Sequence, residues 1–331
     1  MRGQRVDSGQ GSDLAVLGDL VVDLVVPIER LPLLPANHGW AEGIFVEPGG
    51  AGNVVVAAQR LGLATATLAA IGGDRYGAEA LAMLELEGVD VSQVVIHPER
   101  QTVICIVLAD RLGQHVYLGI KDDRGHWPFP RRWHETIRRA RALYTDGYTL
   151  RDLLAPDDVL AACDTARRAN VPVFFDPGPS VEFIPRPVLE RVIASIDVLL
   201  LTEEEATYLN GTRDRARLAR SLRELGCPTV VLKLGGAGCM VATANEVIHA
   251  PGFPVEVVDT VGAGDSFAAA FIAAWRHGGT LRQCATLANA MGAITATQRG
   301  AGTRMPTRER LLRLLVDEPD VLALAGAPTR Q

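Results

Sequence analysis

The sequence has few cysteines, and their spacing argues against the folds that depend on them. Its 331 residues include five cysteines, at positions 105, 163, 227, 239 and 284, and no two of them form a Cys-x-x-Cys pair. An odd number without paired spacing argues against a disulfide framework and against a structural zinc site. A reducing compartment fits this pattern, and we predict a cytoplasmic protein.

Long apolar runs, basic runs and the common nucleotide motifs are also missing. No stretch approaches the roughly 20 apolar residues of a membrane span, and the net charge is −6. These absences argue against a membrane or a nucleic acid as partner. The seven histidines lack His-x-x-x-His spacing, which leaves a metal centre of that kind without support. The absence of Gly-x-x-x-x-Gly-Lys-[Ser/Thr] excludes a P-loop kinase, and no Gly-x-Gly-x-x-Gly follows the first strand, as a dinucleotide fold requires.

The chain instead alternates between helix-like and strand-like segments. From residue 133 to residue 234, four predicted helices are each followed by a short apolar strand. This alternation predicts a three-layer α/β/α domain with a mainly parallel central sheet. Two β-rich pieces, residues 20–47 and 97–121, interrupt the earlier part and predict a small β lid. We expect a disordered leader at residues 1–13, the folded domain at 14–318 and a flexible tail at 319–331.

The segment from Asp259 to Phe267, Asp-Thr-Val-Gly-Ala-Gly-Asp-Ser-Phe, carries the strongest chemical signal. Glycines at a helix N-terminus allow backbone N–H groups to surround an anion, and the helix dipole favours negative charge there. A carboxylate in the same turn, Asp265, is unsuited to binding phosphate but suited to accept a proton from an attacking hydroxyl. The alternative is that Asp265 only caps the helix.

Two further glycine-rich turns flank predicted strands or helices. Gly49 and Gly50 precede a helix that contains Asn53, whose amide can donate to and accept from a sugar hydroxyl. An ordinary strand-to-helix turn also explains this pattern. The turn that begins at Gly235 follows Lys233, which either reaches a nucleotide phosphate or lies in solvent.

A run of acids at a strand-to-helix junction also has two interpretations. Thr202 followed by Glu205 forms a capping box, which explains the pattern structurally. The same acids could position hydrated Mg²⁺. Asp23 lies in an apolar stretch and needs a partner, such as a substrate hydroxyl. Asn289 in a late Ala-rich helix contacts a nucleotide base or faces solvent.

Together, these segments resemble the ribokinase-like carbohydrate kinases, also called the PfkB family, from about Leu14 to Thr307. The resemblance rests on the Gly49–Asn53 segment and on the Asp259–Asp265 segment, in that order along the chain. It implies an ATP-dependent kinase that phosphorylates a hydroxyl, expected to be a primary CH₂OH group, of a sugar or sugar-like molecule.

The resemblance also implies roles for the late glycine-rich segment. Asp265 resembles the catalytic base, and the amides of Gly262, Ala263 and Gly264 resemble the anion hole for the transferred phosphoryl group. Many members of the family bind a monovalent cation beside the anion hole, and Asp259 matches the carboxylate at that site. The resemblance therefore implies that K⁺ binds to this chain.

The remaining implied roles divide between the substrate and the nucleotide. Asp23, Gly49, Gly50 and Asn53 resemble substrate contacts. Nucleotide contacts are implied at Gly235, Gly238 and Asn289. Glu205 matches the glutamate that organises Mg²⁺, although Thr202 stands where the family has asparagine. The lid implies a homodimer interface.

The substrate is less constrained than the reaction. The glycine turn lacks the lysine and the extra residue of the ribokinase subgroup, so D-ribose does not follow from it. Arg100 could anchor a sugar phosphate or lie solvated on the surface, and apolar lid residues such as Ile104 leave a nucleoside open. A vitamin kinase of the same superfamily and a non-catalytic sugar sensor are the remaining alternatives.

Overall fold

The main body is built on one sheet of eight strands. The computed structural model describes residues 11–35 and 38–326. The strand order is β14-β13-β12-β11-β10-β9-β1-β4, parallel from β4 to β12, with β13 and β14 added antiparallel. The bounds are β1 Leu14–Leu17, β4 Thr65–Leu68, β9 Leu143–Asp146, β10 Val173–Asp176, β11 Val198–Thr202, β12 Thr229–Lys233, β13 Cys239–Ala242 and β14 Val247–Ala250.

Apolar side chains on both faces explain why these segments form a covered sheet. In β1, Leu14 and Val16 pack into one apolar core, whereas Ala15 and Leu17 pack into the other. Successive side chains of a strand point to opposite faces, so a continuous apolar run needs a helical layer on each side. The expected three-layer α/β/α architecture is confirmed.

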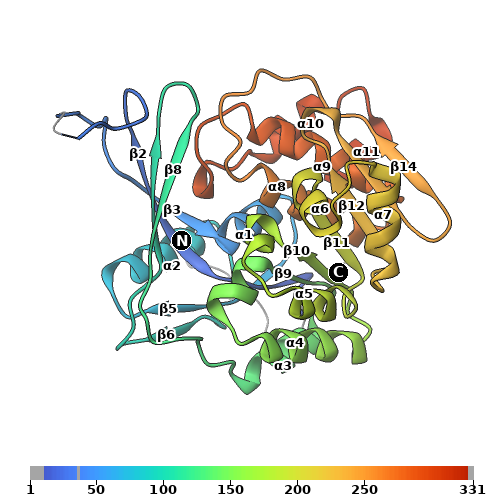
Figure 1. Cartoon of the computed structure of the whole chain (residues 1–331), viewed down its shortest axis with the longest axis horizontal. Coiled ribbons are helices and arrows are strands. Elements are labelled where there is room, and N and C mark those ends of the chain that lie inside the picture. The colour runs from blue at the N-terminus through green and yellow to red at the C-terminus, as the bar shows by residue number, and fades with distance from the viewer. Residues whose placement is uncertain (1–10, 36–37, 327–331) are drawn as a thin grey trace.

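Helices form the two outer layers (Figure 1). One layer packs around the first core and consists of α1 Ala51–Arg60, α2 Arg75–Leu86, α8 Ala263–Arg276, α9 Leu281–Thr295, α10 Arg308–Leu314 and α11 Pro319–Gly326. The other layer consists of α3 Arg131–Arg139, α4 Pro156–Arg168, α5 Arg186–Ile193, α6 Glu203–Asn210 and α7 Arg215–Glu224. Among the described residues, no helix has the length and apolar character needed to cross a membrane.

A second, four-stranded sheet stands at one side of the main body, at the left of Figure 1. We call it the small sheet. Its order is β3-β2-β7-β8, with bounds β2 Leu20–Pro27, β3 Phe45–Gly50, β7 Ile104–Ala109 and β8 His115–Ile120. The expected β pieces, residues 20–47 and 97–121, supply these strands. The remaining pair, β5 Ala70–Gly72 and β6 Val95–His97, forms a separate parallel sheet.

The structure differs from three local predictions. Gly49 and Gly50 do not form a free turn, because β3 runs through Gly50 and α1 begins at the next residue. Residues 319–326 of the expected flexible tail form α11, which buries Val321 and Ala325 in the core, and the rest of that tail lies outside the described residues. The predicted leader lies mostly outside the described residues, but Asp13 is buried and its amide donates to the Ala64 carbonyl at 2.8 Å.

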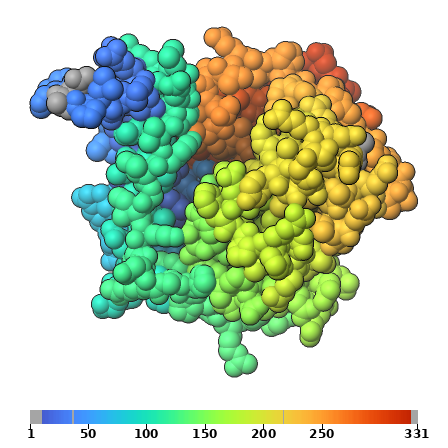
Figure 2. All heavy atoms as spheres, in the orientation of Figure 1, coloured from blue at the N-terminus to red at the C-terminus, as the bar shows by residue number. Residues whose placement is uncertain are grey.

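A hollow separates the small sheet from the C-terminal half of the main body. Figure 2 shows it between the blue and teal strands and the yellow and orange segments. One cavity there has a volume of about 480 Å³ and contains both Asp19 and residues of β7 and β8 in its lining. A second cavity of about 330 Å³ lies over the start of α8. The fold therefore offers two neighbouring binding spaces.

Candidate active site

The carboxyl ends of the parallel strands bring the polar side chains of the site together. Ligands of open α/β sheets bind outside these ends, where loops and helix N-termini meet. The residues placed there are Asp19 just after β1, Asp146 at the end of β9, Asp176 at the end of β10, Thr202 at the end of β11 and Lys233 at the end of β12. Asp265 in the first turn of α8 joins this group.

The turn before α8 leaves backbone amides available. Gly262 precedes the helix with a left-handed φ of 73°, and an added Cβ there would lie 2.6 Å from Met305 Cε. Within the described part of the chain, the amides of Gly262 and Gly264 make no hydrogen bond. The Ala263 amide, expected in the same anion hole, instead donates to the Thr260 carbonyl at 3.2 Å. Two of the three expected amides are thus free.

Asp265 is held in place from α1. Asn53 Nδ2 donates to Asp265 Oδ2 at 2.8 Å, and the Gly302 amide donates to Asn53 Oδ1 at 2.8 Å. Asn53 is buried, so its amide group links the α8 carboxylate to the Gly302 turn. We expected Asn53 to contact the substrate, and that contact stays a prediction; in the structure, its Nδ2 binds Asp265 and its Oδ1 binds the Gly302 amide.

Burial sets the proton affinity of the two central carboxylates. Burial and the Asp176 charge raise the pKa of Asp265, the Asn53 hydrogen bond and Lys233 lower it, and the net result is a pKa of about 6. Burial, with the charges of Asp265 and Glu47, raises the pKa of Asp23 to about 7. A base whose pKa lies close to the working pH is effective in proton transfer.

Asp23 lies in β2 directly against the glycine pair in β3. A Cβ added to Gly49 would lie 2.3 Å from Asp23 Oδ2, closer than any side chain permits. Asp23 makes no hydrogen bond within the described residues, so its carboxylate is available to a ligand. The sequence analysis gave Asp23 and Gly49 as substrate contacts, but it could not show that the Asp23 carboxylate leaves room only for glycine at position 49.

Glu47 was not among the expected site residues. It is buried, and it accepts a hydrogen bond from the Thr303 amide at 2.8 Å and from Arg304 Nε at 3.1 Å. A Cβ on Gly302, which has a φ of 62°, would lie 2.9 Å from Glu47 Oε2. Glu47 and Asn53 therefore fix the same turn, and only the three-dimensional structure brings that turn to the site.

Lys233 is neither free nor solvated. Its Nζ lies 2.6 Å from Asp176 Oδ2, and both side chains are largely buried. The nearby charges of Asp176 and Glu205 raise the pKa of Lys233 in opposition to burial, which lowers it. Lys233 also lines the 330 Å³ cavity, so a phosphate there would compete with Asp176 for the ammonium group.

Glycines and Asn289 shape the other wall of that cavity. Gly235, Gly238 and Asn289 all line it, as the sequence analysis expected for a nucleotide site. Asn289 Nδ2 donates to the carbonyls of Ala250 and Pro251, each at 3.0 Å. A Cβ on Gly238 would lie 2.1 Å from the Ala250 oxygen. Asn289 thus holds the loop that closes against the glycine turn.

The capping box at the start of α6 is present. The Thr202 side chain accepts from the Glu205 amide at 3.2 Å, and Glu205 Oε2 accepts from the Thr202 amide at 2.8 Å. Burial and the Asp176 charge raise the pKa of Glu205. Within the described ranges, no three acidic, histidine or cysteine side chains are grouped to hold a metal ion directly.

Asp259 has more partners than the sequence suggested. It accepts hydrogen bonds from the Val261 amide at 2.9 Å and the Gly300 amide at 2.8 Å. His115 Nε2, from β8 of the small sheet, lies 3.3 Å from Asp259 Oδ1. The small sheet thus brings an imidazole into contact with Asp259, which the local sequence could not show.

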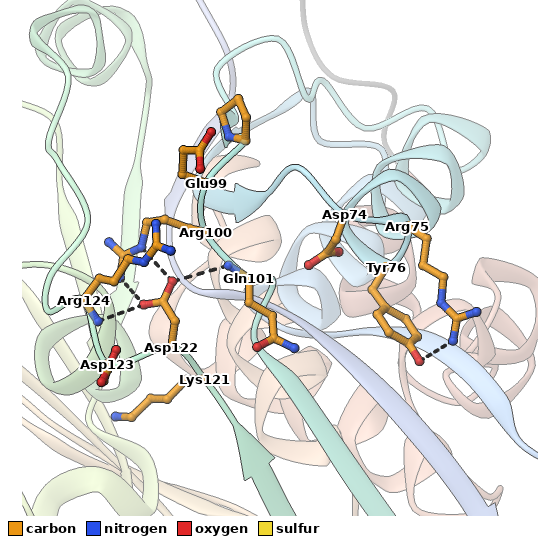
Figure 3. A pocket seen from close by; sticks show the side chains of 11 residues that line it. Asp74, Arg75, Tyr76, Glu99, Arg100, Gln101, Lys121, Asp122, Asp123 and Arg124 are labelled. Atoms are coloured by element: carbon orange, nitrogen blue, oxygen red, sulfur yellow. Dashed lines mark hydrogen bonds and ion pairs between the residues drawn. The ribbon is translucent and has the colours of Figure 1, made fainter.

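Arg100 also departs from both of its expected roles. It forms an ion pair with Asp122 at 2.6 Å, its guanidinium lies 4.0 Å from the ring centre of Trp127, and its Nη2 donates to the Gly125 carbonyl at 2.7 Å. Figure 3 shows the ion pair in an open pocket of about 810 Å³ beside Asp74. Arg100 is neither solvated nor unpaired, and it stabilises the segment that follows β8.

Comparison with known proteins identifies the family. Residues 12–308 match the sequence model of the pfkB family carbohydrate kinases. The chain belongs to this family. Family membership confirms the resemblance and the enzyme class that we expected, a kinase with an alcohol group as acceptor.

Relatives of this pfkB kinase act on different substrates. A nucleoside kinase from Methanothermobacter thermautotrophicus is 27% identical over 300 residues, covering 89% of this chain and 92% of the relative. An ATP-dependent ribose-1-phosphate kinase from Halopiger xanaduensis is 31% identical, covering 90% and 96%. The structure of Arabidopsis thaliana ribokinase complexed with ribose and ATP superposes with a TM-score of 0.80 at 26% identity, covering 92% and 99%. These names leave the substrate of this chain open.

Proposed function

We propose that this pfkB kinase transfers the γ-phosphoryl group of ATP to a primary hydroxyl of a sugar or sugar-like molecule, with Asp265 as the general base. The position of Asp265 carries the proposal. It follows Gly264, which lines the 330 Å³ cavity, and its charge acts on Asp23 on the substrate side. A carboxylate that lies between the cavity for the phosphates and the place of the substrate hydroxyl can remove the hydroxyl proton during phosphoryl transfer.

ATP would occupy the cavity over α8. The free amides of Gly262 and Gly264 at the helix N-terminus would donate to the transferred phosphoryl group. Lys233 would exchange its contact with Asp176 for one with a phosphate. Gly235, Gly238 and Asn289 would border the adenosine.

Magnesium would be held through water by Glu205, which lies close enough to Asp176 for their charges to interact. When bound, Mg²⁺ neutralises charge on the β- and γ-phosphates. A monovalent cation would bind beside Asp259, which fixes the turn through the Val261 amide.

The small sheet would act as the lid of the substrate space and as a homodimer interface. The face of the small sheet opposite to Asp23 carries apolar side chains on three adjacent strands, including exposed Val116 and Leu118 on β8. An apolar sheet face of this kind favours pairing with a second copy. Substrate would contact the inward face through Asp23, beside Gly49 and Gly50.

A nucleoside is the second candidate substrate. The 480 Å³ cavity is lined by Ile104, Ile120, Tyr148 and other apolar groups, and drug-sized ligands occupy cavities of roughly 300–1,000 Å³. A planar base beyond the sugar would fit such a wall. An ADP-release screen that includes both sugars and nucleosides distinguishes the two candidate substrates.

The test is a coupled ADP-release screen with purified protein, ATP and Mg²⁺. Pentoses, hexoses, sugar acids, sugar phosphates and nucleosides are compared, with the Asp265→Asn variant as the enzyme blank. We expect substrate-dependent ADP release in one class and a phosphomonoester product by ³¹P NMR. If the wild-type protein releases no ADP with any class, the proposed function is wrong.

A further inference from the structure

The glycine pair of β3 borders two carboxylates rather than one. A Cβ on Gly49 would collide with Asp23, as described above. A Cβ on Gly50 would lie 2.5 Å from the Asp19 carbonyl oxygen and 2.8 Å from Asp19 Oδ1. Gly50 also has a left-handed φ of 56°, which glycine adopts at no steric cost. The backbone here is shaped around Asp19 as closely as around Asp23.

Asp19 has no protein partner for its carboxylate. The residue is only 7% exposed, and its Oδ1 is buried without a hydrogen bond within the described part of the chain. Asp146, the neighbouring buried acid, by contrast accepts from the Thr149 amide at 2.7 Å. Buried carboxylates are normally hydrogen-bonded, so an unsatisfied one that lines a cavity indicates a missing donor.

We assign the cavity beside Asp19 to the substrate. Asp19 lines the 480 Å³ cavity together with β7, β8 and the Tyr148–Leu153 segment. The two cations nearest to this end, Lys121 and Arg151, both form ion pairs with Asp152. No unpaired cation among the described lining residues therefore faces the Asp19 carboxylate from that segment.

We propose that Asp19 binds a non-reacting hydroxyl of the substrate, next to the hydroxyl held by Asp23, and thereby selects uncharged polyhydroxy substrates. This inference rests on the proposed function and adds to it a residue and a substrate class. A hydroxyl supplies the O–H donor that Asp19 lacks when Asp19 is ionised, and it can accept from Asp19 when Asp19 is protonated, so it satisfies the buried carboxyl group in either state. A phosphate or carboxylate at the same place would add negative charge to a group of buried acids whose mutual repulsion already raises the pKa values of Asp19 and Asp23.

The main alternative gives Asp19 a purely structural role. In that case, Asp19 and Asp146 share a proton and stabilise the end of β1, and the substrate does not contact either of them. Burial and the Asp146 charge do raise the pKa of Asp19 well above its usual range. The two roles differ in one respect that can be measured: only a contact with substrate makes the effect of an Asp19 variant depend on a particular substrate hydroxyl.

The experiment is a mutant cycle between protein and substrate. Wild type and Asp19→Asn are assayed with three parent substrates, D-ribose, D-fructose and adenosine. Each parent is compared with an analogue that lacks one hydroxyl: 2-deoxy-D-ribose, 1-deoxy-D-fructose and 2′-deoxyadenosine. For whichever parent is turned over, the other singly deoxygenated analogues are assayed as well. Ribose 1-phosphate is assayed beside D-ribose. Asp13→Asn, which changes a buried acid remote from the cavity, is the matched control, and melting temperatures verify that each variant folds.

We expect Asp19→Asn to lower kcat/KM for the parent substrate about 10- to 100-fold, as loss of a charged hydrogen bond implies, mainly through KM. One deoxy analogue should show a large penalty with wild type and almost none with Asp19→Asn. The variant should also favour ribose 1-phosphate relative to ribose more than wild type does. Asp13→Asn should leave these ratios unchanged.

Two results separate this inference from the function on which it rests. If wild type turns over a parent substrate but Asp19→Asn retains its kcat/KM and every deoxy penalty, the role of Asp19 is structural and the inference is wrong. A wild-type preference for ribose 1-phosphate over ribose would also overturn it. If wild type turns over no substrate in the panel or in the wider screen, the proposed function is refuted, and this inference is refuted with it.

Discussion

Asp265→Asn tests the proposed mechanism most directly, because it removes the proton acceptor with little change in shape. Asn at this position can still accept the hydrogen bond that Asn53 Nδ2 now donates to Asp265 Oδ2 at 2.8 Å. The orientation of α1 against α8 should therefore persist. What disappears is the ability to take a proton from the attacking hydroxyl, and loss of a general base costs about 10²–10⁴-fold in rate.

The pKa of Asp265, about 6, also predicts the shape of the pH profile. In wild type, kcat/KM should rise as pH increases through about 6 and then level off as the base becomes ionised. Asp23, with a pKa of about 7, adds a second ionisation to the same limb. The Asn variant should lose the limb that belongs to Asp265.

Stability should change in the opposite direction to activity. Burial raises the pKa of Asp265 above its ordinary value of 3.8, so the folded state binds this proton more tightly than the unfolded state. Stability is therefore lost as pH rises from about 4 to about 6, and stays lower above that range. The rise in the pKa of Asp265 corresponds to at most roughly 3 kcal/mol of folding free energy. This figure is an upper limit, because the carboxylate keeps some contact with the cavity, where solvent screens its charge. Asp265→Asn should melt higher than wild type at pH 8 and equally at pH 4.

The assay measures kcat, nucleotide Kd and melting temperature on one preparation of each protein. ATP affinity should hold or improve, because a negative charge leaves the phosphate site. Asp197→Asn is the control, since Asp197 accepts a hydrogen bond from the Val173 amide at the opposite end of the strands. If Asp265→Asn keeps more than about a tenth of the wild-type kcat, it lies outside the general-base range, and Asp265 only caps the helix.

Three further predictions concern the surroundings of the base. Gly49→Ala places a Cβ 2.3 Å from Asp23 Oδ2, so the variant should lose about 1–3 kcal/mol of stability and raise the substrate KM. Thermal melting and kinetics measure both effects, and unchanged values would contradict the close contact between position 49 and Asp23. K⁺ or NH₄⁺ should raise the rate through the turn that Asp259 fixes, and equal rates in Na⁺, K⁺ and Tris would remove this prediction. Leu118→Lys, on the apolar face of the small sheet, should convert a dimer to a monomer in sedimentation velocity at micromolar concentration. Val247→Lys, on the far edge strand β14, is the control and should leave the dimer intact. A monomeric wild-type protein would contradict the predicted dimer.

Sequence reasoning identified the residues that lie together in short motifs. The Asp259–Asp265 segment and the Gly49–Asn53 segment each combine glycines with a polar side chain in one turn of chain, so their chemistry can be predicted locally. The helix and strand order followed for the same reason, because the apolar runs of β1 and β9–β12 require a sheet that is covered on both faces. The tail at 319–326 was missed because its few apolar residues gain their stability from packing in the core rather than from a long amphipathic pattern.

The residues that sequence reasoning missed act through distant partners. Asp176 follows an apolar strand and looks like a simple terminus, yet the ion pair with Lys233 joins two strands whose sequences are 57 residues apart. Glu47 acts on a turn 256 residues away. No local pattern distinguishes such an acid from a solvated one, because its role depends on which strand ends the sheet order brings side by side.

The groups for phosphoryl transfer and the lining of the substrate cavity lie on different elements, which explains why one fold can keep its reaction while relatives differ in substrate. The groups that would perform phosphoryl transfer lie on α8 and the ends of β11 and β12, supported through Asn53 and Glu47 by the turn at Gly302. The cavity that we assign to the substrate is instead lined by the small sheet and by the segment after β9. Side chains there can change without moving Asp265, because none of the hydrogen bonds described for Asp265 comes from β7 or β8. Specificity should therefore depend on residues such as Asp19, which lies where the strand ends of the main sheet meet the wall that the small sheet forms.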